Sequence, residues 1–255
     1  MKQLIKTGRF LYGFGIFVVG MHQFTIRDFR PEILSPFPAW AHTYLVFSMI
    51  TGIALAVAGI AIASAGFYAE RISILLGYFF LTMIITSHLP YILFFSPVKP
   101  TTHLEAWFGA GEALAYSGGA FVMAGSFSGK PIPAGRIFFS ILIILFGFSH
   151  FVFTDAVSAM IPGFFGFPLF WTYLAGTALI LSGIAIIFKV WIRTVALLLA
   201  ILLLLFFIFF HLPDAMHNPS AGHGNEIVRA IIALLFCGIA LVIAATDKHK
   251  NRPSP

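Results

Sequence analysis

The fold of this protein is decided by a stretch in the last quarter of the chain, residues 194–211, which read TVALLLAILLLLFFIFFH. The stretch holds no Asp, Glu, Lys or Arg, and a helix needs about 20 mostly apolar residues to cross a bilayer. The rest of the chain has the same character, because 60% of its 255 residues are hydrophobic and only 9% are charged. A soluble domain has roughly 45–50% apolar and about 25% charged residues. The sequence therefore predicts an integral membrane protein whose main partner is the lipid bilayer.

The net charge and the cysteine count exclude several classes of function. The formal net charge is +6, but the basic residues are scattered between apolar stretches, so no nucleic-acid partner is expected. The only cysteine, Cys237, lies in an apolar run and has no second thiol to pair with. The sequence also lacks a Cys-x-x-Cys-His haem-attachment site, a Gly-x-x-x-x-Gly-Lys nucleotide loop and a His-Glu-x-x-His zinc motif.

The apolar stretches between charges give eight candidate spans. Because open sheets cannot cross hydrocarbon, all eight are expected to be helices. The fold class is therefore predicted to be all-α, a polytopic membrane helix bundle with eight transmembrane helices. The candidate spans are 10–24, 41–65, 72–95, 106–125, 137–153, 168–188, 194–211 and 227–246.

The distribution of basic residues predicts the orientation. An even number of spans places both termini on one side of the membrane. Eleven of the 15 Lys and Arg residues fall on that side, which the positive-inside rule identifies as the cytoplasm. The remaining four, on the outer side, are Arg27, Arg30, Lys99 and Arg229.

The chain also carries an internal repeat. Short motifs from the first half recur in the same order in the second half, as a duplication predicts. The matched pairs are Gly8-Arg9-Phe10 with Gly135-Arg136-Ile137, Gly20 with Gly147, His42-Thr43-Tyr44-Leu45 with Trp171-Thr172-Tyr173-Leu174, Thr51-Gly52-Ile53-Ala54 with Ser182-Gly183-Ile184-Ala185, His88-Leu89-Pro90 with His211-Leu212-Pro213, and Glu112 with Glu226.

The repeat divides the chain into a first membrane unit at 5–128, a second at 133–246 and a short basic cytoplasmic tail at 247–255. Each unit crosses the membrane an even number of times, so the second copy enters with the orientation of the first. Such parallel repeats are related by rotation about the membrane normal. We therefore expect two parallel four-helix repeats, with His88 superposing on His211.

The polar residues share one side of the membrane. Eight of the nine histidines and seven of the nine acidic residues fall on the outer side. The positive-inside rule makes no demand on neutral histidine, so this asymmetry indicates a site near the outer leaflet. No metal is predicted there, because the histidines and acid between 213 and 225 fit no standard zinc spacing.

Several of these polar groups are expected to form an outer-facing pocket. Glu112 lies inside a predicted span, where an ionisable side chain is costly and marks a functional candidate. His88 and His211 each precede a proline by two positions, which predicts that the helix stops or kinks there and frees backbone carbonyls. The predicted catalytic residues are Glu112, Glu226, His88 and His211, and the predicted ligand-binding residues are His22, His150, His42, Tyr44 and Tyr173.

The competing interpretation of these groups is structural. A histidine at a helix end often caps the helix or reaches toward the interface. An acid in the first turn of a helix, as expected for Glu226, is favoured by the helix dipole. On this interpretation the acids and histidines only neutralise one another at buried helix ends.

The motifs also point to a family. A unit that opens with Gly-Arg and an apolar helix ending in Gly20-Met21-His22-Gln23-Phe24 resembles the DoxX/DoxD-like bacterial membrane proteins, as do the Thr-Gly-Ile-Ala and His-Leu-Pro elements. The resemblance covers both halves, although the family unit usually occurs once per chain. It implies a bacterial inner-membrane protein linked to quinone-level redox chemistry, since DoxD-like members act within a thiosulfate:quinone oxidoreductase. No thiosulfate-handling residue carries over.

Three functions remain open from the sequence. The first is a redox-linked protein that binds a quinone near the outer leaflet, with a redox partner subunit and with His and Glu handling protons. The second is a carrier or permease for a small or lipophilic substrate, which parallel repeats also suit. The third is a non-catalytic membrane assembly factor. A haem held by two membrane histidines is possible but is not indicated, and whether the protein is an enzyme stays open.

Overall fold

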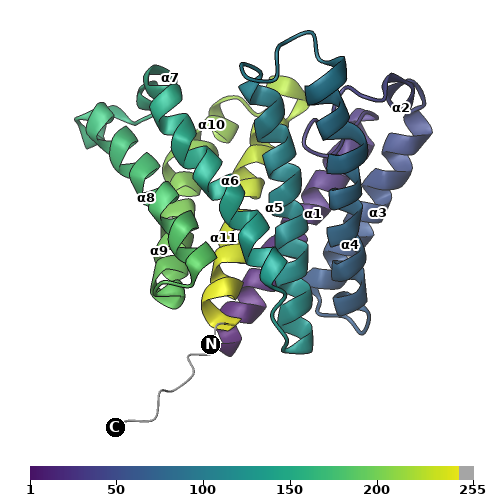
Figure 1. Ribbon diagram of the computed structural model, residues 1–255, viewed down its shortest axis with the longest axis horizontal. Helices are drawn as coiled ribbons and strands as arrows, with labels where there is room; N and C mark the ends of the chain where they lie inside the picture. The colour runs from purple at the N-terminus through teal and green to yellow at the C-terminus, as the bar shows by residue number, and fades with distance from the viewer. Residues whose placement is uncertain (247–255) are drawn as a thin grey trace.

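The computed structural model describes residues 1–246, and within them the chain forms helices joined by short connections (Figure 1). The predicted basic tail at 247–255 lies outside the described residues. Eight long helices stand side by side, with the N-terminus at one end of the bundle and the small helices α2, α7 and α10 at the other. The long helices are α1 (Lys2–Ile26), α3 (Leu45–Ala63), α4 (Ala69–Met83), α5 (Leu104–Ser128), α6 (Pro133–Val152), α8 (Pro168–Phe188), α9 (Ile192–Phe206) and α11 (Asn225–Thr246).

Shorter helical segments complete the bundle. Two of the long helices continue through them, so that α4 belongs to one helix over Ala69–Phe95 and α9 to one over Ile192–His217. The short α-helices are α2 (Ala39–Thr43), α7 (Thr154–Ala159) and α10 (Leu212–His217). The π-helical turns are η1 (Ile84–His88), η2 (Tyr91–Phe95) and η4 (Phe207–His211), and the 3₁₀ turns are η3 (Gly163–Phe165) and η5 (Ala221–His223).

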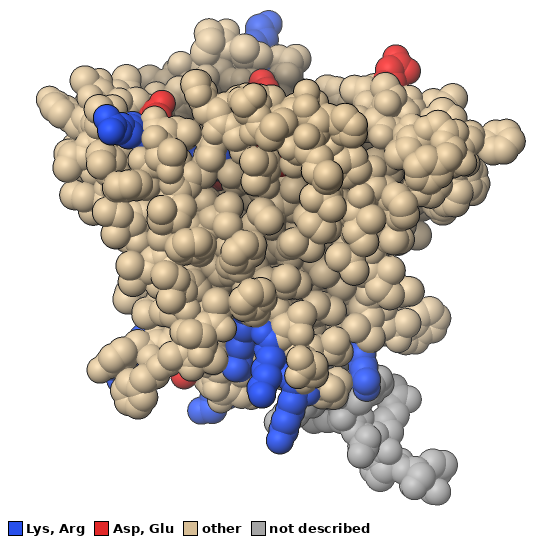
Figure 2. Space-filling model, turned by 180° about the vertical axis from the view of Figure 1, so that it is seen from behind, with Lys and Arg blue, Asp and Glu red and all other residues tan. Residues whose placement is uncertain are grey.

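The structure confirms the predicted fold class, an all-α bundle of membrane-spanning helices. Seven helices in the described residues are long and apolar enough to cross a membrane. Figure 2 shows Lys and Arg gathered at one end of the face in view, with a broad uncharged band separating them from the charges at the other end. The helix outside this set is α5, which is as long as α1 and packs between α4 and α6. Its many glycines and alanines and two acids lower its hydropathy, and the eighth crossing stays a prediction.

The packing of the helices follows the same order in both halves. In the first half α1 packs on α3 and α4 packs on α5, whereas in the second α6 packs on α8 and α9 on α11. Helices of the two halves also pack against each other: α1 packs on α11, and α5 packs on α6. This order is what a duplicated unit would produce. Superposition of 5–128 on 133–246 stays a prediction.

Glycine contacts show the register of these helix pairs. A Cβ added to Gly20 would lie 2.5 Å from the Gly52 carbonyl, and one added to Gly147 would lie 2.8 Å from the Gly176 carbonyl. Small residues let helix backbones approach this closely in membranes. Gly176 therefore occupies the place of Gly52, and the sequence match of Gly52 with Gly183 was wrong by about two helical turns, because small residues recur along both helices.

The repeated His-Leu-Pro motif has the same structure in both halves. The π-turn η1 ends at His88 and the π-turn η4 ends at His211. Proline lacks an N–H and its ring crowds the carbonyl four residues earlier, so a wider turn relieves the helix there. The helix was expected to stop or kink at these positions. The helix continues beyond each proline, so the expected stop was wrong, and a kink stays a prediction. A π-turn, a feature that is frequent at functional sites, ends just before each proline.

Candidate functional site

A buried ion pair lies in the connection between α1 and α3. Arg30 and Glu32 are each only 3% exposed, and the Arg30 Nε donates to Glu32 Oε1. A buried charge is costly unless it is paired and its remaining donors are satisfied. The pair therefore needs further partners.

The guanidinium of Arg30 also hydrogen-bonds one residue from each half of the chain. One of its terminal nitrogens lies 2.8 Å from His22 Nδ1, and the other donates to Asn225 Oδ1 at 2.9 Å. Arginine only donates, so Nδ1 of His22 accepts and the ring proton sits on Nε2. That Nε2 then donates to the His223 carbonyl at 2.8 Å. Arg30 and His22 thus tie α1 to the start of α11.

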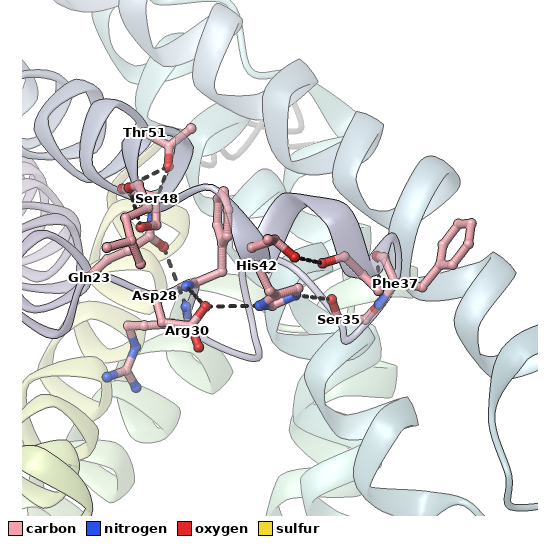
Figure 3. Close-up of polar contacts among 12 residues, drawn as sticks. Gln23, Asp28, Arg30, Ser35, Phe37, His42, Ser48 and Thr51 are labelled. Carbon is pink, nitrogen blue, oxygen red and sulfur yellow. Dashed lines mark hydrogen bonds and ion pairs between the residues drawn. The ribbon is translucent and has the colours of Figure 1, made fainter.

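The same connection is fixed to α3 and α2 by a chain of hydrogen bonds (Figure 3). Buried Gln23 accepts from the Arg30 backbone N–H at 3.5 Å, and its Nε2 donates to Thr51 Oγ1 at 2.7 Å. On the other side, His42 bonds the Asp28 carboxylate and the Ser35 carbonyl, each at 2.9 Å. His42 therefore positions the connection.

The π-turn η1 presents two neighbouring residues to this connection. Ser87 Oγ donates to the Phe37 carbonyl at 2.6 Å and accepts from the Ser35 N–H at 3.0 Å. His88 hydrogen-bonds the backbone of Ile33. The second ring nitrogen of His88, Nε2, is buried and has no hydrogen-bond partner in the described structure.

Two further unpaired polar groups lie on α5. The Tyr116 hydroxyl is fully buried with no partner, and no hydrogen bond or ion pair of the described residues involves the Glu112 side chain. Both residues lie within electrostatic range of Arg30 and Glu32. A Cβ added to Gly109, one turn before Glu112, would lie 3.8 Å from the His88 ring.

These groups follow one stripe of α5. Positions 109, 112 and 116 are spaced by three and four residues, which places them on one helix face. His88 faces the first position, and Glu112 and Tyr116 occupy the other two. The stripe spans about 10 Å, given a rise of about 1.5 Å per residue. It brings three unpaired polar groups together beside a buried ion pair. We call Arg30, Glu32, His88, Glu112 and Tyr116 the outer cluster.

The second half holds no equivalent arrangement. His150 Nδ1 lies 2.7 Å from the Phe146 carbonyl of its own helix, and its ring stacks on Phe206. Glu226 pairs with exposed Arg229 at 2.9 Å, one turn along α11. His211 lies within electrostatic range of Arg229 and makes no hydrogen bond in the described structure.

The structure therefore gathers only some of the predicted site residues. His22, His88 and Glu112 belong to or adjoin the outer cluster, and His42 supports it from behind. Tyr44 and Tyr173 lie at the surface, 57% and 44% exposed, beside other aromatic rings.

The match of Glu112 with Glu226 was also wrong. Gly118 packs on Gly135 in the same way as Gly238 packs on Gly8. This register gives position 232, an isoleucine, the place of Glu112 in the second half. The sequence alignment joined the two acids because apolar helices offer few other landmarks.

Sequence reasoning missed Arg30, Glu32, Asn225 and Tyr116. The available signal was the alternation of charge at Asp28, Arg30 and Glu32 in a proline-rich connection, which reads equally well as a solvated loop. Among residues 1–246, no group of three or more His, Cys, Asp or Glu side chains could hold a metal ion. Two hollows in the described residues lie at the opposite, basic end of the bundle.

The fold and the polar contacts together define a polytopic α-helical membrane protein. Its two halves are joined at one end by the Arg30–Asn225 and His22–His223 hydrogen bonds. Residues 132–212 match the family model DoxX, so this segment of the chain is similar to the DoxX family. The matched segment runs from just before α6 to the His-Leu pair after α9, about a third of the chain. Comparisons with curated proteins and with solved structures found no match. The resemblance seen in the sequence is thus confirmed for the second half.

Proposed function

We propose that the protein binds the head group of a membrane quinone at the outer cluster and handles its protons as part of a quinone-linked redox system. The observation that carries the proposal is the stripe of unpaired polar groups formed by His88, Glu112 and Tyr116. Buried polar groups are normally hydrogen-bonded. The unpaired His88 Nε2 and Tyr116 hydroxyl, with the partly buried Glu112 between them, therefore suit a ligand that completes their hydrogen bonds.

The chemistry of a quinone fits this stripe. Its ring is flat and apolar, and Tyr116 is flanked by the rings of Phe80 and Phe236 at 5.3 and 6.0 Å. Its oxygens exchange protons when two electrons pass to or from the ring. A hydroxyl such as that of Tyr116 donates to a quinone oxygen, and an unprotonated imidazole nitrogen accepts from a quinol hydroxyl. The electrons would come from or go to a separate redox partner.

Binding of decylubiquinone to the purified chain in detergent tests the proposal. We expect Tyr116→Phe and Glu112→Gln to lower the affinity roughly tenfold, the effect of one buried hydrogen bond to a ligand. His211→Gln and Glu226→Gln are the matched controls, since they change the same residue types outside the cluster. Folding of each variant is checked by thermal unfolding. Unchanged affinity in folded Tyr116→Phe and Glu112→Gln would sink the proposal.

A carrier is the second candidate, and one observation favours it. The bonds of Arg30 to Asn225 and of His22 to His223 close the outer end between the halves, while a hollow lined by α5, α6, α9 and α11 lies at the basic end. Alternating access requires that these outer bonds open. Slow external labelling of a cysteine placed at buried Ile33 would support this function over a fixed quinone site.

A further inference from the structure

A second candidate site lies at the basic end, away from the outer cluster. A hollow of about 480 Å³ opens between the first turns of α1 and the turn that joins α3 to α4. Gln3, Lys6 and Thr7 contribute to it from α1, and Ala63 and Ser64 from the other wall. The volume falls in the range of small-molecule sites, roughly 300–1,000 Å³.

The walls of this hollow carry positive charge and no acid. Of its eight lining residues two are basic, Lys6 and Arg9, and none is Asp or Glu. Lys6 takes part in no hydrogen bond or ion pair of the described structure. Arg9 is held in place, since its Nε donates to Ser126 Oγ at 2.9 Å and its guanidinium lies 3.8 Å from the Phe127 ring centre. The site therefore has one fixed cation and one available cation.

The remaining lining residues separate into polar and apolar groups. Gln3, Thr7 and Ser64 add hydrogen-bonding side chains next to the cations. Phe10, one turn after Lys6 along α1, is apolar and 54% exposed. A ligand that fits both parts has an anionic, hydroxylated head and an apolar tail. Basic pockets at this membrane level suit anionic lipid head groups.

We infer that this hollow binds the phosphodiester head group of an anionic phospholipid. The phosphate lies between Lys6 and Arg9, the head-group hydroxyls face Gln3 and Ser64, and the acyl chains run along Phe10. The site is separate from the outer cluster and independent of any quinone chemistry.

Native mass spectrometry of the full chain, titrated with short-chain phosphatidylglycerol or phosphatidylcholine, tests the inference. We expect one phosphatidylglycerol to bind ahead of phosphatidylcholine, and Lys6→Gln to weaken it roughly fivefold, the contribution of one basic residue. Lys130→Gln is the matched control, because it removes the same charge at the same end outside the hollow. Ala63→Leu keeps every charge but narrows the hollow, and should weaken binding as well.

Three results would contradict binding of phosphatidylglycerol in this hollow. Equal weakening by Lys6→Gln and Lys130→Gln would mean a diffuse basic belt and would overturn the inference. Displacement of phosphatidylglycerol by excess inorganic phosphate would assign the hollow to free phosphate and overturn it too. Unaltered binding in both Lys6→Gln and Ala63→Leu, with thermal unfolding unchanged, would place the lipid elsewhere.

Discussion

The two halves pack their helices in the same order but differ in the connection at the end opposite the N-terminus. In the first half, residues 27–38 fold back into the bundle and bury Arg30, Glu32 and Ile33. In the second half, residues 153–167 form α7 and η3 and leave aromatic rings outside, with Phe164 76% and Phe167 84% exposed. The same packing order thus carries a buried polar connection in one half and an exposed aromatic connection in the other.

The two π-turns differ at one residue that contacts the first connection. Ser87 in η1 bonds Ser35 and Phe37 and so holds the first connection, whereas η4 has Phe210 at the corresponding position. Phenylalanine offers no such bond. The half that matches the DoxX model lacks this bond. The outer cluster lies in the other half, where Arg30 donates a hydrogen bond to Asn225 at the start of α11.

The largest expected effect is all-or-none labelling by a membrane-impermeant maleimide in intact cells. In a Cys237→Ser background, Phe164→Cys should label from outside, and Ile33→Cys should not, because it is buried. Lys130→Cys should label only after lysis, as the positive-inside rule predicts. Rapid external labelling at position 130 would defeat the predicted orientation of the spans.

A second prediction concerns the two ion pairs. Glu32→Gln leaves Arg30 charged, buried and without its counter-charge, which should lower the free energy of unfolding by about 3–5 kcal/mol. Glu226→Gln breaks a pair whose arginine is 58% exposed, and should cost below about 1 kcal/mol. Equilibrium unfolding in mixed micelles measures both. Equal losses of unfolding free energy in the two variants would show that burial of the Arg30–Glu32 pair does not raise the cost of breaking it.

The third prediction concerns the close glycine contacts between helices that occur in both halves. An added Cβ at Gly20 meets the Gly52 backbone at 2.5 Å, and one at Gly147 meets Ile180 and the Gly176 backbone within 2.8 Å. Both Gly20→Ala and Gly147→Ala should therefore lower the free energy of unfolding by roughly 1–3 kcal/mol. Gly66→Ala is the control, because its nearest neighbours lie at 3.6 Å. A neutral Gly147→Ala would mean that the halves do not share this packing.

The sequence predicted what depends on local pattern. Long apolar runs gave the membrane helices, and the repeated His-Leu-Pro marked both π-turns. It did not predict the burial of Arg30, because the bond to Asn225 joins residues 195 positions apart and no local pattern encodes it. Position 112 was singled out as a costly acid, and whether it acts in a site stays a prediction. Its partner at 226 was chosen by residue type, whereas the helix register places Ile232 there.

The smallest effect is expected at the exposed second connection. Phe164 touches Phe165 and Phe209, but most of its ring is uncovered, so Phe164→Ala removes little buried apolar area and should cost less than about 1 kcal/mol. Ile33→Ala, at 0% exposure in the first connection, should cost about 2–5 kcal/mol in the same measurement. The ratio of the two losses of unfolding free energy measures how much more the first connection contributes to stability than the second. A loss at Phe164 as large as that at Ile33 would mean that a second copy or a lipid-bound partner covers the aromatic surface, and the contrast between a packed and an open connection would fail.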